Sequence, residues 1–476
     1  MNEDVKNTGT ADTQAFYHIN SFRTESVDAE FTGAYVFPGR NRNFLINDQG
    51  YSILLDDDLL KDITENTIGE ELAVTLIQHR FLRLDDVPEE TGKKVSFDGI
   101  HPVFFMIDLT NSCNMACKYC LRESEGSENS KILSDEKAIE ICEHILRYCK
   151  DTGEDRITVQ PWGGEPLLER RKIFLIQDYL TERGITPCIS IETNGLLLND
   201  GLIDELHSRN IWVSVSIDGP KAIHDNQRVF RDGSPTHSVV EKNLIRLRDK
   251  FRGRISVIAT LTKESCSHVK EIIHYLVKDL KLTDVKLNFV HKSSFVDNDA
   301  LCMTEDEIAE CTKVIFETFL ELTEAGYPVS DYNIFTKMSN LIYNQKEDSC
   351  ISGGCHGGRR MIVFDHNGDI YPCDVTDYPE ECLGNIGEGM GLVDIVSRAM
   401  KTHKYFSEKR EDKCNDCPWY CYCRGGCTVH VKTEGAEPPA IDRIECAVNR
   451  MLYPLMVNKI LSEPEQVNLI MREEVL

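Results

Sequence analysis

Short apolar runs alternate with segments of helical periodicity through the middle of the chain. The first run covers residues 103–109, and Ser134 then caps a predicted helix that extends to Cys149. Five more apolar runs follow, separated by helix-length segments, at residues 156–160, 188–191, 212–217, 255–261 and 285–290. Six strand–helix units in this order predict parallel strands with right-handed crossovers and functional residues at the carboxyl ends of the strands.

The first hundred residues do not join this series. A turn at residues 47–50 separates the apolar runs 43–46 and 51–55, and an acidic, helix-like region extends from residue 56 to about residue 82. We therefore predict a separate small α+β domain over residues 1–95. The other predicted parts are a barrel at 96–310, a helical bridge at 311–345, a cysteine-rich domain at 346–450 and a helical tail at 451–476.

Composition narrows the function classes. The chain has 476 residues, too many for one ordinary core, and a formal net charge of −26, which argues against nucleic acid as a partner. No apolar stretch approaches the ~18 residues of a membrane span, and the first residues do not resemble a signal peptide. We expect a cytoplasmic protein without a membrane partner. Its 19 cysteines then favour metal over disulfides, because cytoplasmic thiols are kept reduced.

Three cysteines follow the first apolar run directly. Cys113, Cys117 and Cys120 have the spacing C-x3-C-x2-C, and the aromatic Tyr119 precedes the third cysteine. Three thiolates on a four-iron cubane leave one iron open to a small molecule. A zinc site or three buried structural cysteines are the alternatives.

Polar and glycine residues follow the later predicted strands. Gly163, Gly164 and Glu165 begin the sequence GGEP after the second strand, where glycine allows a close backbone approach and a carboxylate can balance an ammonium group. The further candidates after the third and fourth strands are Thr193, Asn194, Ser216, Asp218 and Arg228. Simple turn formation is the alternative role for these residues.

The C-terminal region holds a second set of cysteines. Their spacing is C-x12-G-x4-C, then C-x2-C-x5-C-x3-C, with one further cysteine on each side. Eight thiolates would fill two complete cubanes. The eight residues are Cys350, Cys355, Cys373, Cys414, Cys417, Cys423, Cys427 and Cys446. A four-thiolate zinc site formed by Cys414, Cys417, Cys423 and Cys427 is the alternative.

Together these motifs resemble the radical S-adenosylmethionine (SAM) superfamily and its SPASM subgroup, over roughly residues 100–450. The resemblance implies an α/β fold: a partial (βα)6 barrel, a small winged-helix-like α+β domain before it and a cysteine-rich SPASM domain after it. In this family the open iron chelates SAM, and electron transfer cleaves SAM to a 5′-deoxyadenosyl radical. An external donor, flavodoxin or ferredoxin, would supply the electron.

The resemblance also implies ligand sets and residue roles. The first three cysteines would bind the SAM-cleaving cluster, with Tyr119, the GGEP residues and the polar strand-end residues around SAM. Two auxiliary clusters would give three [4Fe–4S] clusters in all. Their ligand sets would be Cys350, Cys355, Cys373 and Cys427 for the first, and Cys414, Cys417, Cys423 and Cys446 for the second.

Asp374 directly follows one of these cysteines. It matches an aspartate that acts as general base in anaerobic sulfatase-maturing enzymes, provided that it reaches the substrate proton. A solvent-facing turn residue is the alternative.

The predicted function is the maturation of a ribosomally made precursor peptide. The favoured chemistry is formation of cysteine thioether crosslinks, as in sactipeptide and ranthipeptide maturases, with the N-terminal domain binding the leader of the precursor. One alternative is an enzyme that oxidises serine or cysteine of a sulfatase to formylglycine, and another is a non-catalytic iron–sulfur electron carrier. On this prediction, deleting residues 1–95 leaves all three clusters in place and impairs only peptide processing.

Overall fold

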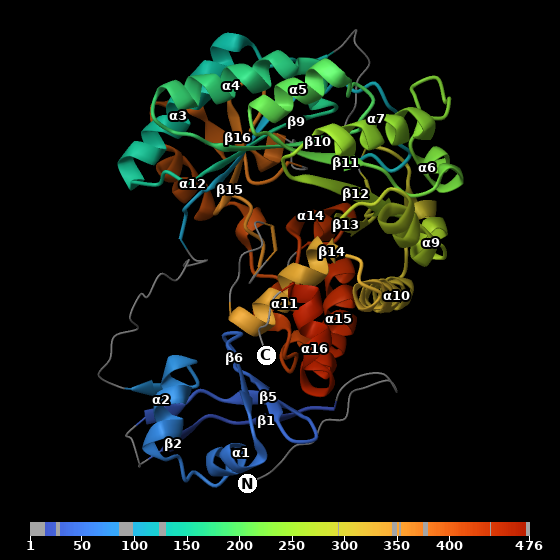
Figure 1. The fold of residues 1–476 in the computed structure, drawn as a ribbon. Helices are drawn as coiled ribbons and strands as arrows, with labels where there is room; N and C mark the ends of the chain where they lie inside the picture. The colour runs from blue at the N-terminus through green and yellow to red at the C-terminus, as the bar shows by residue number, and fades with distance from the viewer. Residues whose placement is uncertain are drawn as a thin grey trace.

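The computed structural model describes residues 15–24, 29–84, 99–122, 130–293, 295–344, 350–351, 354–374, 379–437 and 439–472. A large mixed sheet forms the centre of the molecule (Figure 1). Six of its strands run parallel in chain order: β8 (Phe104–Thr110), β9 (Thr158–Gly163), β10 (Cys188–Thr193), β11 (Trp212–Ser216), β12 (Ile255–Leu261) and β13 (Asp284–Phe289). The six-unit prediction is therefore confirmed, with strand ends displaced by three residues or fewer.

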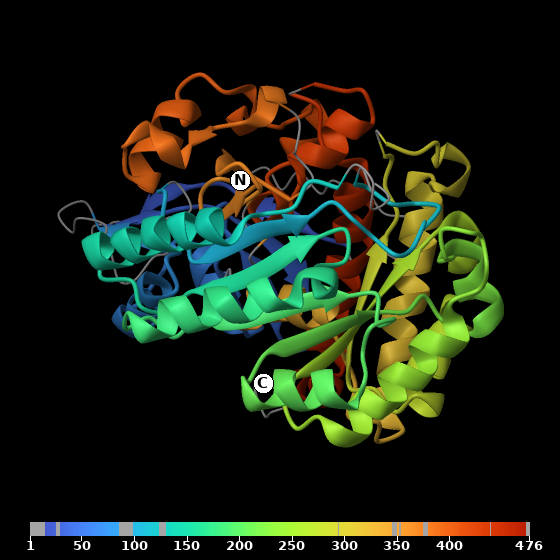
Figure 2. The same ribbon diagram turned by 90° about the horizontal axis from the view of Figure 1, so that it is seen from above.

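Helices follow these strands and cover the outer face of the sheet (Figure 2). The covering helices are α3 (Asp135–Thr152), α4 (Arg170–Glu182), α5 (Asp200–Ser208), α6 (Lys221–Gln227), α7 (His237–Lys250), α8 (Lys263–Cys266) and α9 (Val269–His274). The predicted cap of the first is present, because the Ser134 hydroxyl accepts a hydrogen bond from the Lys137 amide at 3.1 Å. Cys142 and Cys149 on this helix are buried in the core.

The cysteine-rich region extends the same sheet. Strand β15 (Met361–Phe364) pairs in parallel with β8, and it is followed by β16 (Asp369–Tyr371) and β17 (Gly384–Asn385). Three short helices complete this region: α12 (Leu392–Met400), α13 (Tyr420–Cys423) and α14 (Thr428–Thr433). Because β15 lies beside β8, the SPASM-like region is joined to the barrel at the strand that carries the first cysteine loop.

The N-terminal region is a folded unit with its own buried cluster. It has a four-stranded sheet of β1 (Tyr17–Ile19), β4 (Ala34–Pro38), β5 (Asn43–Ile46) and β6 (Ser52–Leu55), and a three-stranded sheet of β2 (Phe22–Thr24), β3 (Ala29–Phe31) and β7 (Leu82–Leu84). Helices α1 (Asp57–Thr64) and α2 (Glu70–Gln78) fall in the predicted acidic region. The predicted turn joins β5 and β6 as an antiparallel hairpin. Residues 1–14, 25–28 and 85–95 of the predicted domain lie outside the described residues.

Four further helices lie between the N-terminal unit and the barrel or along its side (Figure 1). They are α10 (Glu305–Glu324), α11 (Tyr332–Tyr343), α15 (Arg443–Ser462) and α16 (Pro464–Met471). Strand β14 (Ser330–Asp331) extends the sheet beyond β13. None of the helices in the described part of the chain has both the length and the apolar character needed to cross a bilayer.

One disulfide departs from the expectation of metal-bound and reduced cysteines. Cys266 at the end of α8 is joined to Cys311 of α10, and their Cα atoms are 6.0 Å apart. The two residues are 45 positions apart in the chain, and only the packing of these helices brings them together, so spacing could not reveal the pair.

Candidate active site

The GGEP segment supports the first cysteine loop through backbone contacts. The Gly164 amide donates to the Thr110 carbonyl at 2.7 Å, and the Glu165 amide donates to the Ser112 carbonyl at 2.9 Å. A Cβ atom on Gly163 would lie 2.2 Å from the Thr110 oxygen, and one on Gly164 would lie 2.3 Å from the Ser112 oxygen. The glycines are therefore required for the close approach to the cysteine loop, a contact that the sequence argument had assigned to a ligand.

Neighbouring thiols of this loop raise the pKa of Cys113 and Cys117. Burial is the largest cause, and it raises the pKa of Cys113 to about 11 and that of Cys117 to about 12. The guanidinium of Arg228, 3.9 Å from the Cys117 sulfur, acts in the opposite direction. Cysteine binds iron as a thiolate. These sulfurs are therefore suited to bind a positively charged metal centre.

Tyr119, Asp218 and Arg228 form a buried group behind the loop. The Tyr119 hydroxyl donates to Asp218 at 2.6 Å, and the Arg228 Nε lies 3.0 Å from the other Asp218 oxygen. Asp218 is fully buried and also accepts from the Thr260 amide. These contacts give Asp218 a supporting position under the cysteine loop, and its predicted contact with SAM remains a prediction. Ser216 is half-buried at the end of β11.

Glu165 links the GGEP segment to the end of β10. Its carboxylate accepts from the Thr193 hydroxyl at 2.7 Å, the Asn194 amide at 2.8 Å and the Leu167 amide at 3.1 Å. The Asn194 side chain in turn reaches the Cys113 sulfur at 3.8 Å. Burial raises the pKa of Glu165, and these three hydrogen bonds act against that shift. The structure thus joins three predicted residues in one network, while their contact with the ammonium group of SAM remains a prediction.

Polar side chains that the sequence argument missed line the inner face of the sheet. Because side chains alternate along a strand, Glu192 of β10 and Lys286 of β13 face the side opposite to the covering helices. Burial raises the pKa of Glu192, Lys286 lowers it and Asp374 raises it, while Gln160 hydrogen-bonds the carboxylate. A carboxylate within a strand that carries no other charged residue was the available signal for this site.

The first auxiliary group of cysteines gathers beside the inner face. Burial raises the pKa of Tyr405, and so do the charges of Cys355, Cys373 and Cys427. The Tyr405 hydroxyl lies 3.2 Å from the Cys355 sulfur. Burial likewise raises the pKa of Cys373, and Cys350 and Cys427 raise it further. These are the four residues that the family resemblance assigned to one cluster.

Asp374 lies next to this group. Its carboxylate accepts from the Cys373 thiol at 3.0 Å, and its carbonyl accepts from Arg122 at 2.9 Å. Arg122 also pairs with Asp108 of β8. Asp374 is thus connected through Arg122 to the barrel strand that carries the first cysteine loop. Its charge also raises the pKa of Glu192 on the inner face of the sheet.

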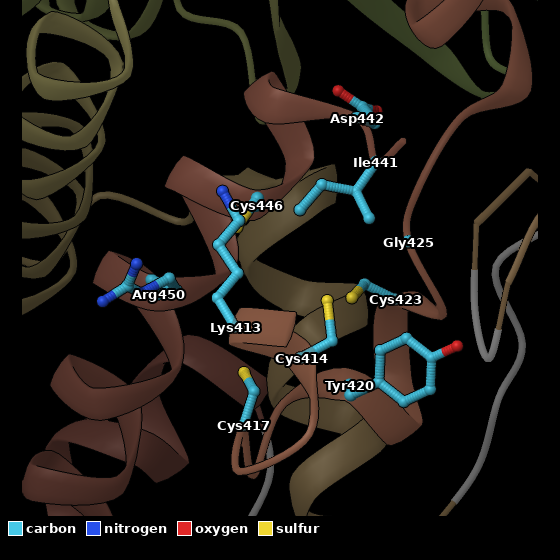
Figure 3. A pocket seen from close by; sticks show the side chains of 10 residues that line it. All are labelled: Lys413, Cys414, Cys417, Tyr420, Cys423, Gly425, Ile441, Asp442, Cys446 and Arg450. Atoms are coloured by element: carbon cyan, nitrogen blue, oxygen red, sulfur yellow. The ribbon is translucent and has the colours of Figure 1, made fainter. Parts of the chain in front are cut away.

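The second auxiliary group surrounds a single cavity (Figure 3). Four thiols line it, together with the cationic side chains of Lys413 and Arg450 and the ring of Tyr420; the cysteines are Cys414, Cys417, Cys423 and Cys446. Burial raises the pKa of the Cys446 thiol to about 11, while Lys413 and Arg450 lower it. Four thiols, one buried and three half-buried, with cations nearby fit an anionic four-thiolate cluster.

The grouping does not match the zinc alternative. Cys427 packs with Cys355 and Cys373 in a small apolar cluster of its own, whereas Cys446 takes the fourth place beside Cys414. The buried carboxylate of Asp442 lies between the groups, because it lines the second cavity and accepts from the Cys427 amide at 3.0 Å. Cys382 donates to the carbonyl of Gly384 and packs against the same apolar cluster as Cys355 and Cys427, and Cys421 donates to the carbonyl of Pro418.

Comparison with known families agrees with this architecture. The radical SAM superfamily model matches residues 107–276, and the iron–sulfur cluster-binding SPASM model matches residues 355–418. The chain thus contains a radical SAM domain and a SPASM domain. These two domains imply iron–sulfur clusters and SAM as cofactors.

Known radical SAM enzymes are similar over most of the chain. A cysteine-type anaerobic sulfatase-maturating enzyme of Clostridium perfringens is 26% identical over 341 residues, which cover 68% of this chain and 89% of that enzyme. The radical SAM cyclopropyl synthase TigE of Paramaledivibacter caminithermalis is 21% identical over 410 residues, covering 84% of this chain and 80% of TigE.

Two solved structures share the fold. The enzyme anSMEcpe, with bound AdoMet and a Kp18Cys peptide, superposes with a TM-score of 0.63 at 20% identity, covering 75% of this chain and 99% of that one. Streptococcus suis SuiB, bound to its precursor peptide SuiA, superposes with a TM-score of 0.52 at 16% identity, covering 83% of this chain and 94% of SuiB.

We predict that the anaerobically reconstituted radical SAM enzyme holds about twelve iron and twelve sulfide ions per chain, from four of each per cubane. Replacing Cys113, Cys117 and Cys120 by alanine should remove about a third of the iron and leave the other two groups filled. Iron and sulfide analysis of both proteins checks this. Stoichiometric zinc with little iron would contradict the cluster assignment.

A second prediction concerns Gly164→Ala. The new Cβ would meet the Ser112 carbonyl, so the cysteine loop must shift; SAM affinity should fall by about tenfold or more, equivalent to about 1.4 kcal/mol. Equilibrium dialysis of SAM measures the effect. Gly201→Ala is the matched control, because its Cβ would have 3.6 Å to its nearest neighbour outside the helix. Equal SAM affinity in the two variants would show that the segment does not support the loop.

Proposed function

We propose that this radical SAM enzyme modifies a ribosomally made precursor peptide, with cysteine thioether crosslinks as the favoured product. The observation that carries the proposal is the N-terminal unit. It has its own buried core, precedes both family matches and ends its larger sheet in an open edge beside a cavity. Such an edge suits a peptide that binds as an added strand.

Strand β6 is that edge, since among the described strands it pairs only with β5. At Ser52 the edge is already occupied: the Asn344 side chain accepts from the Ser52 amide at 2.5 Å and donates to its carbonyl at 3.3 Å. Groups two residues apart in a strand point the same way, so the Leu54 amide and carbonyl also face outward. Leu54 lines the adjacent cavity of about 300 Å³, together with Thr75, His79 and residues of α11 and α15. We place the leader of the precursor along this edge.

The acidic residues of the N-terminal unit favour a positively charged leader. Helices α1 and α2 each begin with exposed acidic residues, Asp57 and Asp58 in the first and Glu70 and Glu71 in the second. A leader with lysine or arginine would be attracted to this surface, and salt would weaken the attraction. Residues 85–90 of the predicted acidic surface lie outside the described residues.

The reaction requires two functions of the protein. SAM on its cluster supplies hydrogen-atom abstraction when bound, and the protein must position the substrate and accept a proton from it. Glu165 and Asn194 hold the end of β10 against the cysteine loop, while Glu192 and Asp374 place two carboxylates near each other. Joining a cysteine sulfur to the carbon radical releases the thiol proton and one electron. Asp374 is our proposed acceptor of the proton, and an auxiliary cluster would accept the electron.

Formylglycine formation is the second candidate. It is favoured by the sulfatase-maturating relatives and by Asp374, which directly follows a cysteine of the first auxiliary group. That chemistry needs the same proton acceptor and no leader-binding unit. For either product, we propose a cytoplasmic enzyme reduced by flavodoxin or ferredoxin.

Leu54→Pro tests the binding edge. Proline removes the outward N–H without breaking a bond to β5, and the unpaired partner in the leader costs about 1–3 kcal/mol, or roughly tenfold or more in affinity. Leu54→Ala keeps the N–H and is the control. The probe is a short cysteine-containing peptide encoded beside the gene, labelled at its N-terminus and followed by fluorescence anisotropy. Equal binding by the two variants would reject the edge as the leader site.

The product distinguishes the two chemistries. A thioether crosslink keeps the sulfur, removes two hydrogen atoms and eliminates one iodoacetamide-reactive thiol per crosslink. Formylglycine made from cysteine loses the sulfur and gives a hydrazide-reactive aldehyde. We expect mass spectrometry of the precursor peptide to show the first pattern and a cysteine-containing sulfatase peptide to remain unmodified. An aldehyde on the sulfatase peptide would establish the second candidate instead.

A further inference from the structure

The N-terminal unit packs directly on the segment that carries ligands of the second auxiliary group. Phe37 of β4 is fully buried, yet it belongs to the main core of the molecule rather than to the separate cluster of the N-terminal unit. Its ring stacks on that of Trp419, with centroids 5.1 Å apart and planes 23° from parallel. Trp419 lies two residues after Cys417, so this contact reaches the neighbourhood of a cluster ligand.

Trp419 is held on both sides and touches the ligand through its backbone. Tyr453 of α15 stacks on the ring at 5.1 Å, nearly parallel at 15°. The backbone amides of Trp419 and Tyr420 hydrogen-bond the Cys417 sulfur. The backbone that carries these N–H groups is thus held by the two rings that stack on Trp419. Such donors orient metal ligands and tune iron–sulfur sites.

The β5–β6 turn makes a second contact with the same segment. Gly50 has a positive φ of +80°, and a Cβ there would lie 3.3 Å from both the Cys421 sulfur and the Tyr422 ring. The Tyr422 hydroxyl donates to the Gly50 carbonyl at 3.2 Å. Cys421 stands between the ligands Cys417 and Cys423 in the chain. The turn thus contacts the segment at Cys421 and Tyr422.

We propose that the N-terminal unit is part of the second auxiliary-cluster site: Phe37 clamps Trp419 against Tyr453, and this clamp holds the Cys417 ligand in place. The inference rests on the cluster assignment within the proposed function and is independent of leader binding. It replaces the expectation that residues 1–95 can be deleted without loss of a cluster. The N-terminal unit, which we propose to bind the peptide, then also stabilises a cofactor.

The test uses the full chain, reconstituted anaerobically, in two alanine variants. Phe37→Ala removes the ring that stacks on Trp419. Phe22→Ala is the matched control, because its ring stacks on Phe31 at 5.0 Å within the N-terminal unit. Iron release to a chelator is followed by absorbance, and the clusters that remain are followed by electron paramagnetic resonance.

We expect Phe37→Ala to lose about a third of its iron, one cubane of three, at least tenfold faster than the unchanged protein. Phe22→Ala should match the unchanged protein, and SAM affinity should be the same in all three. Equal iron release in Phe37→Ala and the unchanged protein would overturn the proposal. So would the same accelerated loss in Phe22→Ala, or loss of all three clusters together.

A second pair of variants keeps the test decisive if Phe37→Ala does not fold. Trp419→Phe keeps a ring between Phe37 and Tyr453 and should release iron at the normal rate, whereas Trp419→Leu should release one cluster rapidly. Identical release by these two variants would also overturn the proposal. None of these measurements uses a peptide, so a failure of leader binding would leave their outcome unchanged.

Discussion

The burial of cysteine thiols is the constraint on which the rest of the structure depends. Burial raises the pKa of thiols in all three groups, as at Cys117, Cys373 and Cys423, so each group is suited to a positively charged partner. The surrounding chain is arranged to hold these sulfurs in fixed places. Backbone amides, Arg228, Tyr405 and the aromatic clamp around Trp419 all contact or border a ligand sulfur.

The barrel and the SPASM domain are connected at the site that we propose to be catalytic. Strand β15 continues the barrel sheet next to β8, and Arg122 connects Asp108 of β8 with Asp374 of the SPASM domain. The proposed proton acceptor is therefore positioned from both domains at once. A substrate side chain on the inner face of the sheet would lie near the carboxylates of Glu192 and Asp374.

Much of this architecture could be predicted because its signals are local. Apolar runs located the six strands, and cysteine spacing identified residues that the structure gathers into three groups. Contacts between distant segments left no such signal. The parallel pairing of β15 with β8, the Cys266–Cys311 disulfide and the stacking of Phe37 on Trp419 arise only from tertiary packing.

Glu165 shows which part of a motif's role the sequence leaves open. The sequence GGEP predicts a contact with SAM, and the structure adds that the carboxylate of Glu165 accepts three hydrogen bonds from its own chain. Local sequence names the residue types at a site, whereas the partners of a buried polar group depend on the whole fold.

Reductive cleavage of SAM tests the central claim most directly. The reconstituted enzyme, reduced anaerobically with dithionite, should convert SAM to 5′-deoxyadenosine and methionine, as measured by liquid chromatography with mass detection. Cys117→Ala should abolish the product while leaving the auxiliary groups filled. A reduced protein with filled clusters that binds SAM but forms no 5′-deoxyadenosine, with or without peptide, would contradict the account.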